Sequence, residues 1–537
     1  MRNYLLGILA LLFTGCNTNT ASHTEITVGQ STIGQHIERL ASDEFLGRKP
    51  FSEGEVKTVN YLKEEFAKLG LSPGNGDSYF QEVPMIEITG TTSQQITITG
   101  TQENLELDYF KDFMAVSKRT DSVVNLENSE LVYAGYGIVA PEYGWNDYEG
   151  VDWKGKTAVV LVNDPGFQSG DSTLFKGNEM TYYGRWTYKY EEAARQGADG
   201  ILIIHETEPA SYGWNVIQSG WSGSQLILES KVPVVKIQGW ISNESADRLI
   251  ELSPLKGKNY KEMARSKDFN PVPLGLRTSI EVSNTVKRNV SKNVAALLPG
   301  SERQDEYILY SAHWDHFGIG RPINNDSIYN GAVDNASGTA CLLAIAEAFK
   351  KVDQQKRSIV FIAVTAEEQG LLGSAYYAEH PIYEPQRTVA NINMDAFKSP
   401  GPMKDLTITG YGQSEMDRYA EEAAKKQGRY VIPDPEPEKG YFFRSDHFNF
   451  AKIGIPALYA DGSYEGFEVS ADSIKKLNDY YRTNIYHQPA DEYDPNTTVL
   501  SGIQFDAQLL FEVGLKLANE DYFPKWNEGS EFKAARN

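Results

Sequence analysis

The feature that most constrains the fold of this chain is a regular alternation of apolar and amphipathic segments in its second half. Apolar segments of strand length occupy residues 306–312, 358–364, 388–394, 405–411 and 454–460. Segments with helical periodicity occupy residues 336–352, 414–428 and 499–519. Continuous apolar strands that alternate with helices are typical of a mostly parallel sheet buried on both faces. We therefore predict an α/β fold with a mostly parallel, twisted sheet flanked by helices.

The first half of the chain has a different pattern of strand and helix segments. Residues 52–70 have helical periodicity, with Ser52 and Glu55 as a capping box. Residues 127–262 carry short β-rich segments and one helical segment, which predicts a strand-dominated inserted domain. We predict six segments: a leader (1–15), a polar tether (16–30), the first part of the main domain (31–126), the β-rich insert (127–262), the second part of the main domain (263–525) and a tail (526–537).

The N-terminal residues have the pattern of an export signal. Arg2 precedes an apolar run from Leu5 to Phe13, and small residues follow before Cys16. This run is far shorter than the roughly 20 apolar residues of a membrane-spanning helix, so we interpret it as a secretory signal. The motif FTGC resembles a bacterial lipobox, which implies a lipid on Cys16 and an exported protein anchored to a bacterial membrane, facing the periplasm or the cell surface. The alternative is a plain secretory signal with an incidental cysteine.

Composition excludes some partners. The formal net charge of −22 argues against nucleic acid, because phosphate binding needs clustered Lys and Arg. The chain has only 2 cysteines, Cys16 and Cys341, so no disulfide framework is expected once Cys16 carries a lipid. We predict that Cys341 is a small buried core residue.

Polar side chains follow three of the predicted strands at their carboxyl ends. His313 follows the first strand, Glu367 and Glu368 come after the second, and Asp395 follows the third. Because the ligand crevice of an open α/β sheet lies beyond the carboxyl ends of its strands, these side chains predict one site. Two further candidates lie in loops: Asp334 and His487.

Each candidate also has an ordinary structural explanation. Thr365 and Glu368 fit a helix capping box, in which Thr365 caps the following helix. Asp334 fits a helix N-cap. A lone histidine in a loop, such as His487, is usually a surface residue.

The order of the motifs resembles the di-zinc exopeptidases of the bacterial leucyl aminopeptidase and glutamate carboxypeptidase clan. The motifs are His313-Trp314-Asp315, Gly331 to Gly338, Glu367-Glu368, Asn391 to Asp395, and Tyr486-His487. The resemblance covers roughly residues 290–520 and the part from about 31 to 125. It implies the zinc-peptidase (phosphorylase/hydrolase-like) fold and two Zn²⁺ per chain.

The resemblance also implies a role for each residue. The metal ligands would be His313 and Asp395 for one zinc ion, Glu368 and His487 for the other, and Asp334 for both. Glu367 would be the general base, and Asp315 would orient the imidazole of His313. Imidazole and carboxylate suit zinc, and one shared carboxylate leaves each ion three protein ligands and an open position.

Two other segments resemble parts of these enzymes. Residues 443–450 resemble a segment near the substrate, which implies that Arg444, Asp446 and His447 line the pocket; the alternative is that the segment is a structural loop. Ser445, Asp446 and His447 do not form a catalytic triad, because three consecutive side chains diverge. Residues 127–262 resemble a protease-associated domain, which implies a non-catalytic lid or substrate-guiding module. The Trp and Tyr side chains of this segment either pack the domain or form a binding face.

These features together predict a zinc-dependent exopeptidase, foremost an aminopeptidase that removes N-terminal residues from peptides. The alternatives are a carboxypeptidase, a glutaminyl cyclase with one zinc ion, and a non-catalytic receptor-like binding protein. The complete ligand set, together with Glu367 and Asp315, disfavours the receptor. Ala396, which follows Asp395, and Gln488, which follows His487, differ from the residues usual in the family. These differences leave the metal ligands intact and concern the substrate pocket.

Overall fold

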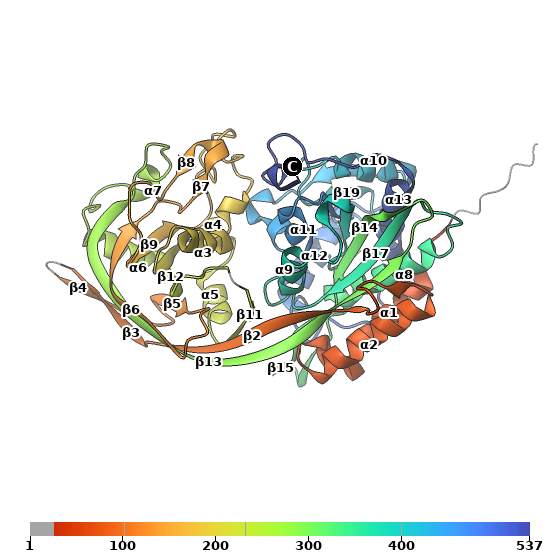
Figure 1. Ribbon diagram of the computed structural model, residues 1–537, viewed down its shortest axis with the longest axis horizontal. Coiled ribbons are helices and arrows are strands. Elements are labelled where there is room, and N and C mark those ends of the chain that lie inside the picture. Colours follow the sequence, from red (N-terminus) through yellow and green to blue (C-terminus); the bar gives the residue numbers. More distant parts are fainter. Residues whose placement is uncertain (1–25, 101–102, 231, 399, 537) are drawn as a thin grey trace, which may run out of the picture.

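The computed structural model of the protein describes residues 26–100, 103–230, 232–398 and 400–536. The chain forms two lobes, and two long antiparallel strands, β2 (Phe80–Thr92) and β13 (Val272–Leu298), run past both of them (Figure 1). The predicted leader and the predicted lipid site at Cys16 lie outside the described residues. Within the described ranges, no helix combines the length and the apolar character needed to cross a membrane.

The first lobe contains the predicted parallel sheet. Its central strands lie in the order β17 (Arg357–Val364), β14 (Arg303–His313), β18 (Thr388–Asn393) and β21 (Ala457–Asp461), and all of them are parallel. Antiparallel neighbours complete it: β13 pairs with β17, and β19 (Asp405–Ile408) pairs with β21. A short strand, β20 (Tyr430–Pro433), runs parallel to β19. The prediction of a mostly parallel α/β sheet is confirmed.

Helices cover both faces of this sheet, and alternate strand residues explain how. Ile308 and Tyr310 of β14 pack with the larger group of helices, whereas Leu309 packs with the smaller group on the opposite face. The larger group contains α1 (Gln30–Leu40), α2 (Glu53–Lys68), α8 (Gly338–Phe349), α10 (Met416–Lys426) and α13 (Leu500–Asn519). The smaller group contains α9 (Leu372–Glu379) and α11 (His447–Lys452). Because successive strand side chains point to opposite faces, a strand covered on both sides is apolar throughout.

The second lobe is also built on parallel strands. They lie in the order β6 (Val123–Tyr133), β9 (Lys156–Leu161), β10 (Gly200–His205) and β12 (Ile237–Ser242), and β5 (Phe113–Val116) joins β12 antiparallel. Its helices are α3 (Trp186–Arg195), α4 (Thr207–Ala210), α5 (Trp214–Gly220), α6 (Asn243–Glu251) and α7 (Tyr260–Met263). The lobe therefore contains more helix than the strand-dominated pattern predicts.

The core of this second lobe extends beyond the predicted insert, residues 127–262. Its buried cluster begins at Ile96 and ends at Val282, because β3 (Gln95–Thr99), β4 (Asn104–Asp108) and the first half of β13 belong to the same sheet. Trp186 lies 4.9 Å from Trp221 between ring centroids, and Trp221 lies 5.8 Å from the buried Trp240. These aromatic side chains pack the lobe.

The remaining strands are β1 (Ser72–Pro73), β7 (Val139–Ala140), β8 (Trp145–Asn146), β11 (Ser224–Leu228), β15 (Gly318–Ile323) and β16 (Asp326–Tyr329), and the remaining α-helix is α12 (Ala471–Asn484). Cys341 is fully buried on α8, as predicted. Ser52 caps α2 as predicted, since its hydroxyl accepts the N–H groups of Gly54 and Glu55 at 3.1 and 3.4 Å.

Two local predictions are wrong. The predicted tether, 16–30, ends earlier, because Val28 is buried and its N–H donates to Gln508 of α13 at 2.8 Å. Thr365 does not cap a helix, because α9 begins only at Leu372 and the Thr365 hydroxyl instead pairs with that of Ser291 at 2.7 Å. Both positions are held by contacts with residues distant in sequence.

The two lobes also meet through a contact apart from the long strands. The N–H of Met180 donates to the carbonyl of Pro437 at 3.2 Å. The ring of Tyr182 lies 6.1 Å from that of Phe443 and 5.2 Å from that of Phe448. The residues around 180 and around 443 are therefore neighbours in space.

Candidate metal centre

The carboxyl ends of the parallel strands place the candidate side chains at one edge of the sheet. His313 is the last residue of β14, Asp395 comes two residues after β18, and Glu368 lies in the loop between β17 and α9. Asp334 lies just before α8, and His487 follows α12. Because neighbouring parallel strands end at the same edge of the sheet, the strand order alone brings His313, Glu368 and Asp395 close together.

The distances divide these side chains into two groups that share Asp334. Nε2 of His313 lies 3.2 Å from Oδ1 of Asp334 and 3.2 Å from Oδ1 of Asp395. Nε2 of His487 lies 3.2 Å from Oδ2 of Asp334 and 3.3 Å from Oε2 of Glu368. The two oxygens of one carboxylate therefore face two different histidines, as a bridging ligand requires.

These spacings fit two zinc ions. Two donors on one tetrahedral zinc ion, each about 2.0–2.1 Å from the metal, lie about 3.4 Å apart. The four nitrogen–oxygen distances are within 0.2 Å of that value. The donors are also of the imidazole and carboxylate types that zinc binds. The two triads, His313–Asp334–Asp395 and His487–Asp334–Glu368, could therefore hold two zinc ions.

Glu367 stands beside the triads without belonging to either. Its Oε2 lies 3.9 Å from Nε2 of His313, and its backbone N–H donates to Oδ1 of Asp315 at 3.1 Å. Burial raises the pKa of Glu367 well above its ordinary value, although the charge of His313 opposes this rise. The carboxyl group of Glu367 therefore lies beside the two triads and close to His313.

The carboxylate of Asp315 lies close to the imidazole of His313 but is too far away to form a hydrogen bond with it. Its Oδ1 is 3.7 Å from Nδ1 of His313, and the nearest acceptor to that nitrogen is the main-chain oxygen of Asp315, at 3.2 Å. The same Oδ1 holds the N–H of Glu367. In this structure Asp315 therefore connects the loops that carry His313 and Glu367.

A buried chain of hydrogen bonds ends on Asp395. Asn391 donates to Ser311 at 2.9 Å, Ser311 to Asn393 at 2.6 Å, and Asn393 to the hydroxyl of Ser445 at 2.8 Å. Ser445 then donates to Oδ2 of Asp395 at 2.5 Å. This chain holds Asp395 with its other oxygen toward His313. Sequence reasoning missed it, because its partners come from three separate segments.

Asp491 holds the loop of the bridging carboxylate. Its two carboxylate oxygens accept the N–H groups of Val333 and Asp334 at 3.0 and 3.1 Å. Burial raises the pKa of Asp491 to about 7. Because Asp491 lies four residues after His487, it connects the loop of His487 to that of Asp334. In the sequence, only its place in the motif YHQPADEY (residues 486–493) indicates that Asp491 belongs to the site.

Arg48, from the N-terminal part of the chain, forms hydrogen bonds with the segments next to His313 and Asp334. Its buried guanidinium donates to the carbonyls of Trp314, Asn330 and Gly331 at 2.9, 2.6 and 2.8 Å. Burial lowers the pKa of Arg48 to about 10. The guanidinium ties the segment after His313 to the segment before Asp334.

His316 is a further neighbour that the sequence analysis did not assign. Its Nδ1 lies 2.6 Å from Oε1 of Glu368, and the ligand atoms of His316, Asp334 and Glu368 all lie within 4.8 Å of one another. Burial lowers the pKa of His316 to about 3, so the ring is neutral. Its place in the sequence HWDH, three residues after His313, was the available signal.

The three predicted pocket residues have different surroundings. Asp446 is buried and accepts a hydrogen bond from Ser374 at 2.5 Å. His447 is fully buried, with its ring 4.6 Å from that of Phe442. Arg444 is half-buried beside the ring of Tyr441 at 5.4 Å. Of the three, only Arg444 keeps an accessible side chain.

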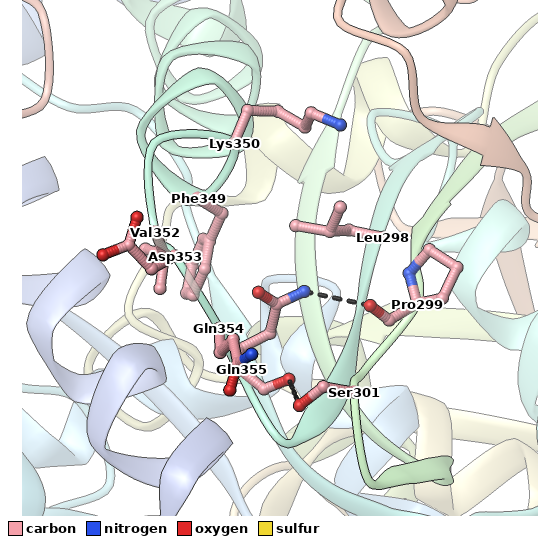
Figure 2. Close-up of a pocket in the computed structure, with 9 residues that line it drawn as sticks. All are labelled: Leu298, Pro299, Ser301, Phe349, Lys350, Val352, Asp353, Gln354 and Gln355. Atoms are coloured by element: carbon pink, nitrogen blue, oxygen red, sulfur yellow. Dashed lines mark hydrogen bonds between the residues drawn. The ribbon is translucent and has the colours of Figure 1, made fainter.

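A hollow of about 240 Å³ lies near the amino end of β17 and therefore away from the candidate metal ligands (Figure 2). Its wall includes the hydrogen bonds from Gln355 to Pro299 and from Ser301 to Gln355, each 3.0 Å. The lining has one acidic side chain, Asp353, and contains no histidine. The possible metal ligands therefore lie at the carboxyl edge of the sheet and not in this hollow.

The fold and the site together define a cluster of possible metal ligands at the carboxyl edge of a parallel α/β sheet. Residues 293–505 match the sequence model of peptidase family M28. This match contains all five candidate metal ligands, and it confirms the resemblance to the di-zinc exopeptidase clan.

Individual relatives share shorter segments. The chain is 36% identical over 129 residues to aminopeptidase NAALADL1 of Mus musculus, which is 23% of this chain and 16% of that protein. It is 34% identical over 199 residues to the glutamate carboxypeptidase 2 homolog of Caenorhabditis elegans, which is 35% of this chain and 23% of that protein. The chain thus matches less than a quarter of either relative. The solved aminopeptidase from Aneurinibacillus sp. strain AM-1 is 20% identical, with a TM-score of 0.49 over 93% of this chain and 96% of that one.

Proposed function

We propose that this protein is a zinc-dependent exopeptidase, foremost an aminopeptidase that hydrolyses the first peptide bond of its substrates. The observation that carries the proposal is the position of Asp334, whose two oxygens face His313 and His487. This arrangement lies within the segment that matches a peptidase family. It favours two metal ions over the single zinc of a glutaminyl cyclase.

The residues of the chain divide the chemistry between them. When bound, the two zinc ions lower the pKa of a water molecule and stabilise the negative charge that develops on the peptide oxygen. Glu367 accepts a proton from the attacking water and delivers it to the departing amine nitrogen. Ser445 and Asp491 hold Asp395 and Asp334 in place, so that no ligand has to reorganise during the reaction.

The test of this proposal is an assay on peptides that are blocked at one end. A peptide with a free N-terminus and an amidated C-terminus should be cleaved. The same sequence with an acetylated N-terminus and a free C-terminus should not be cleaved. A chelator should abolish cleavage, and elemental analysis should find close to two zinc ions per chain. Cleavage of only the N-acetylated peptide would instead establish a carboxypeptidase, and one firmly bound metal ion would favour the cyclase.

We further propose that the second lobe is a protease-associated domain that guides substrate. The support is the contact of Met180 and Tyr182 with Pro437 and Phe443, because this contact adjoins the segment that holds Asp395 through Ser445. The Met180→Glu variant, which places a charge in the contact, should raise KM for long peptides more than for aminoacyl anilides. Equal effects on both kinds of substrate would contradict a guiding role.

We also propose that the protein is exported and attached to a bacterial membrane by a lipid on Cys16. The support is the sequence FTGC after a short apolar run. In cells, the Cys16→Ser variant should move from the membrane fraction to the soluble fraction or remain unprocessed. A membrane-bound variant of normal processed mass would contradict the proposal, and a Cys341→Ser variant serves as the control.

A further inference from the structure

His316 is a buried histidine that the proposed chemistry leaves without a role. Its ring is fully shielded from solvent, and its Nδ1 lies 2.6 Å from Oε1 of Glu368, whose side chain is only 4% exposed. The other ring nitrogen, Nε2, is also shielded and has no hydrogen-bond partner among the described residues. Within the described part of the chain, the ring of His316 therefore forms its hydrogen bond with Glu368 alone.

The short distance between His316 and Glu368 decides between two roles for the ring. His316, Asp334 and Glu368 are close enough to hold a metal ion together. Two donors on one tetrahedral zinc ion, however, lie about 3.4 Å apart, and the four nitrogen–oxygen pairs within the two triads are 3.2 or 3.3 Å apart. A separation of 2.6 Å is that of a short hydrogen bond to a charged acceptor. Because an ionised carboxylate can only accept, Nδ1 of His316 is the donor.

The surroundings of His316 hold the ring in this position. Gly331 leaves the space that the ring occupies, because a Cβ atom at Gly331 would lie 2.6 Å from Cγ and 2.7 Å from Cδ2 of His316. Gly331 is itself held by the hydrogen bond from Arg48 to its carbonyl, at 2.8 Å. The ring of Phe317 lies 4.9 Å from that of His316. A side chain that is locked by packing keeps its donor directed at one acceptor.

The same arrangement exists at the other triad. Oδ2 of Asp395 accepts the hydroxyl of Ser445 at 2.5 Å, and its Oδ1 faces the histidine of its triad at 3.2 Å. Likewise, Oε1 of Glu368 is occupied by His316, and its Oε2 faces the histidine of its own triad at 3.3 Å. Each of these two carboxylates thus has one oxygen bonded to a buried donor and the other directed at a metal position.

We propose that His316 is a positioning residue that keeps Glu368 a one-oxygen ligand of the metal position shared by His487 and Asp334. With Oε1 occupied, three protein donors remain for this position, which suits a four-coordinate zinc ion. Without the donor, Glu368 can turn or can offer both oxygens, which suits ions that take more oxygen ligands, such as Mn²⁺. The inference rests on the two-zinc centre of the proposed function and names the residue that sets the geometry of one position.

Two variants separate the hydrogen bond from the packing of the ring. His316→Phe keeps an aromatic ring and removes the donor, whereas His316→Asn places an amide N–H near the position of Nδ1 without the ring. In zinc titrations against a competing chelator, His316→Phe should bind one zinc ion about 10–100-fold more weakly, the usual effect of losing such a partner, and the other ion normally. His316→Asn should recover most of this loss. Unchanged affinity in His316→Phe, or no recovery in His316→Asn, would overturn the proposal.

A double variant identifies the affected position. His487→Ala retains only the zinc ion of the other triad, so the addition of His316→Phe should leave the affinity for that ion unchanged. A further loss in the double variant would show that His316 supports the whole centre, and it would contradict the proposal. His205→Phe, at a buried histidine of the second lobe, serves as the control and should bind both zinc ions normally. Circular dichroism of each variant establishes that the fold survives.

Spectroscopy of the cobalt-loaded protein reports on the geometry without any substrate. The visible absorption of Co²⁺ weakens as its coordination number rises above four, so His316→Phe should show weaker absorption from one of its two ions. The ratio of Mn²⁺ to Zn²⁺ affinity at that position should also rise. An unchanged spectrum with an unchanged ratio would contradict the positioning role.

These measurements also separate the inference from the proposed function. A wild type that binds two zinc ions and cleaves no peptide would refute the peptidase proposal alone, and the metal titrations would still decide the role of His316. Normal cleavage together with zinc binding that does not depend on His316 would refute only the positioning role. A wild type that binds no second zinc ion would refute both.

Discussion

The Glu367→Gln variant is expected to lose about 10²–10⁴-fold in kcat, which is the usual contribution of a general acid–base residue. Glu367 is not a member of either ligand triad, and its nearest carboxylate oxygen lies 3.9 Å from Nε2 of His313. The amide of glutamine has the same shape and cannot accept the proton of the attacking water. Zinc content should therefore remain close to two per chain while turnover falls.

The matched control for this variant is Glu192→Gln, which neutralises a buried glutamate in the second lobe. It should retain normal kcat, so that any loss specific to Glu367 reflects the chemistry of the centre. The thermal unfolding temperature of Glu367→Gln should not fall, because burial disfavours the charged form of this carboxyl group and the glutamine side chain is uncharged. Normal turnover of Glu367→Gln would exclude this residue as the base.

The Asp334→Ala variant is expected to lose both metal ions together with nearly all activity. Each oxygen of Asp334 faces a different histidine, so a single substitution removes one ligand from each triad. Loss of an outer-shell partner alone typically costs 10–100-fold in metal affinity. The loss of a direct ligand from both sites should exceed this, and zinc content measured after dialysis should fall below one per chain.

The comparison variant for Asp334→Ala is His487→Ala, which removes a ligand from one triad only. It should retain about one zinc ion per chain, held by His313, Asp334 and Asp395, whose ligand atoms lie within 4.8 Å of one another. If Asp334→Ala retained one firmly bound zinc ion, the carboxylate would not be a bridge. Circular dichroism of both variants would establish that the fold survives.

The sequence allowed the central strands to be predicted because their burial is uniform. All residues of β17 and β18 are buried, so most of their side chains are apolar on both faces, although β18 also contains Asn391 and Asn393. A polar residue directly after such a run lies at the end of the strand, and the carboxyl ends of parallel strands share one edge. His313 and Asp395 could therefore be assigned to one site before their distance was known.

The errors occurred where a distant contact outweighed a local signal. Thr365 and Glu368 have the spacing of a capping box, yet Thr365 is held by Ser291 and its N–H donates to Asn293 at 3.0 Å. The sequence pattern predicts the edge of the insert at residue 127, whereas β3, β4 and β5 contribute side chains to the same buried cluster as the insert. No pattern within a short window reports on a partner more than 70 residues away.

The sequence by itself determined the α/β class, the strands that end at the site and the types of the ligand side chains. The tertiary structure alone decided that Asp334 faces two histidines at once and that Ser445 orients Asp395. It alone brought the segments around Met180 and Phe443 together from opposite lobes. The physical reason is that strand and helix patterns depend on local periodicity and burial. Hydrogen bonds, shared ligands and paired charges instead depend on atoms that only folding brings within a few ångströms.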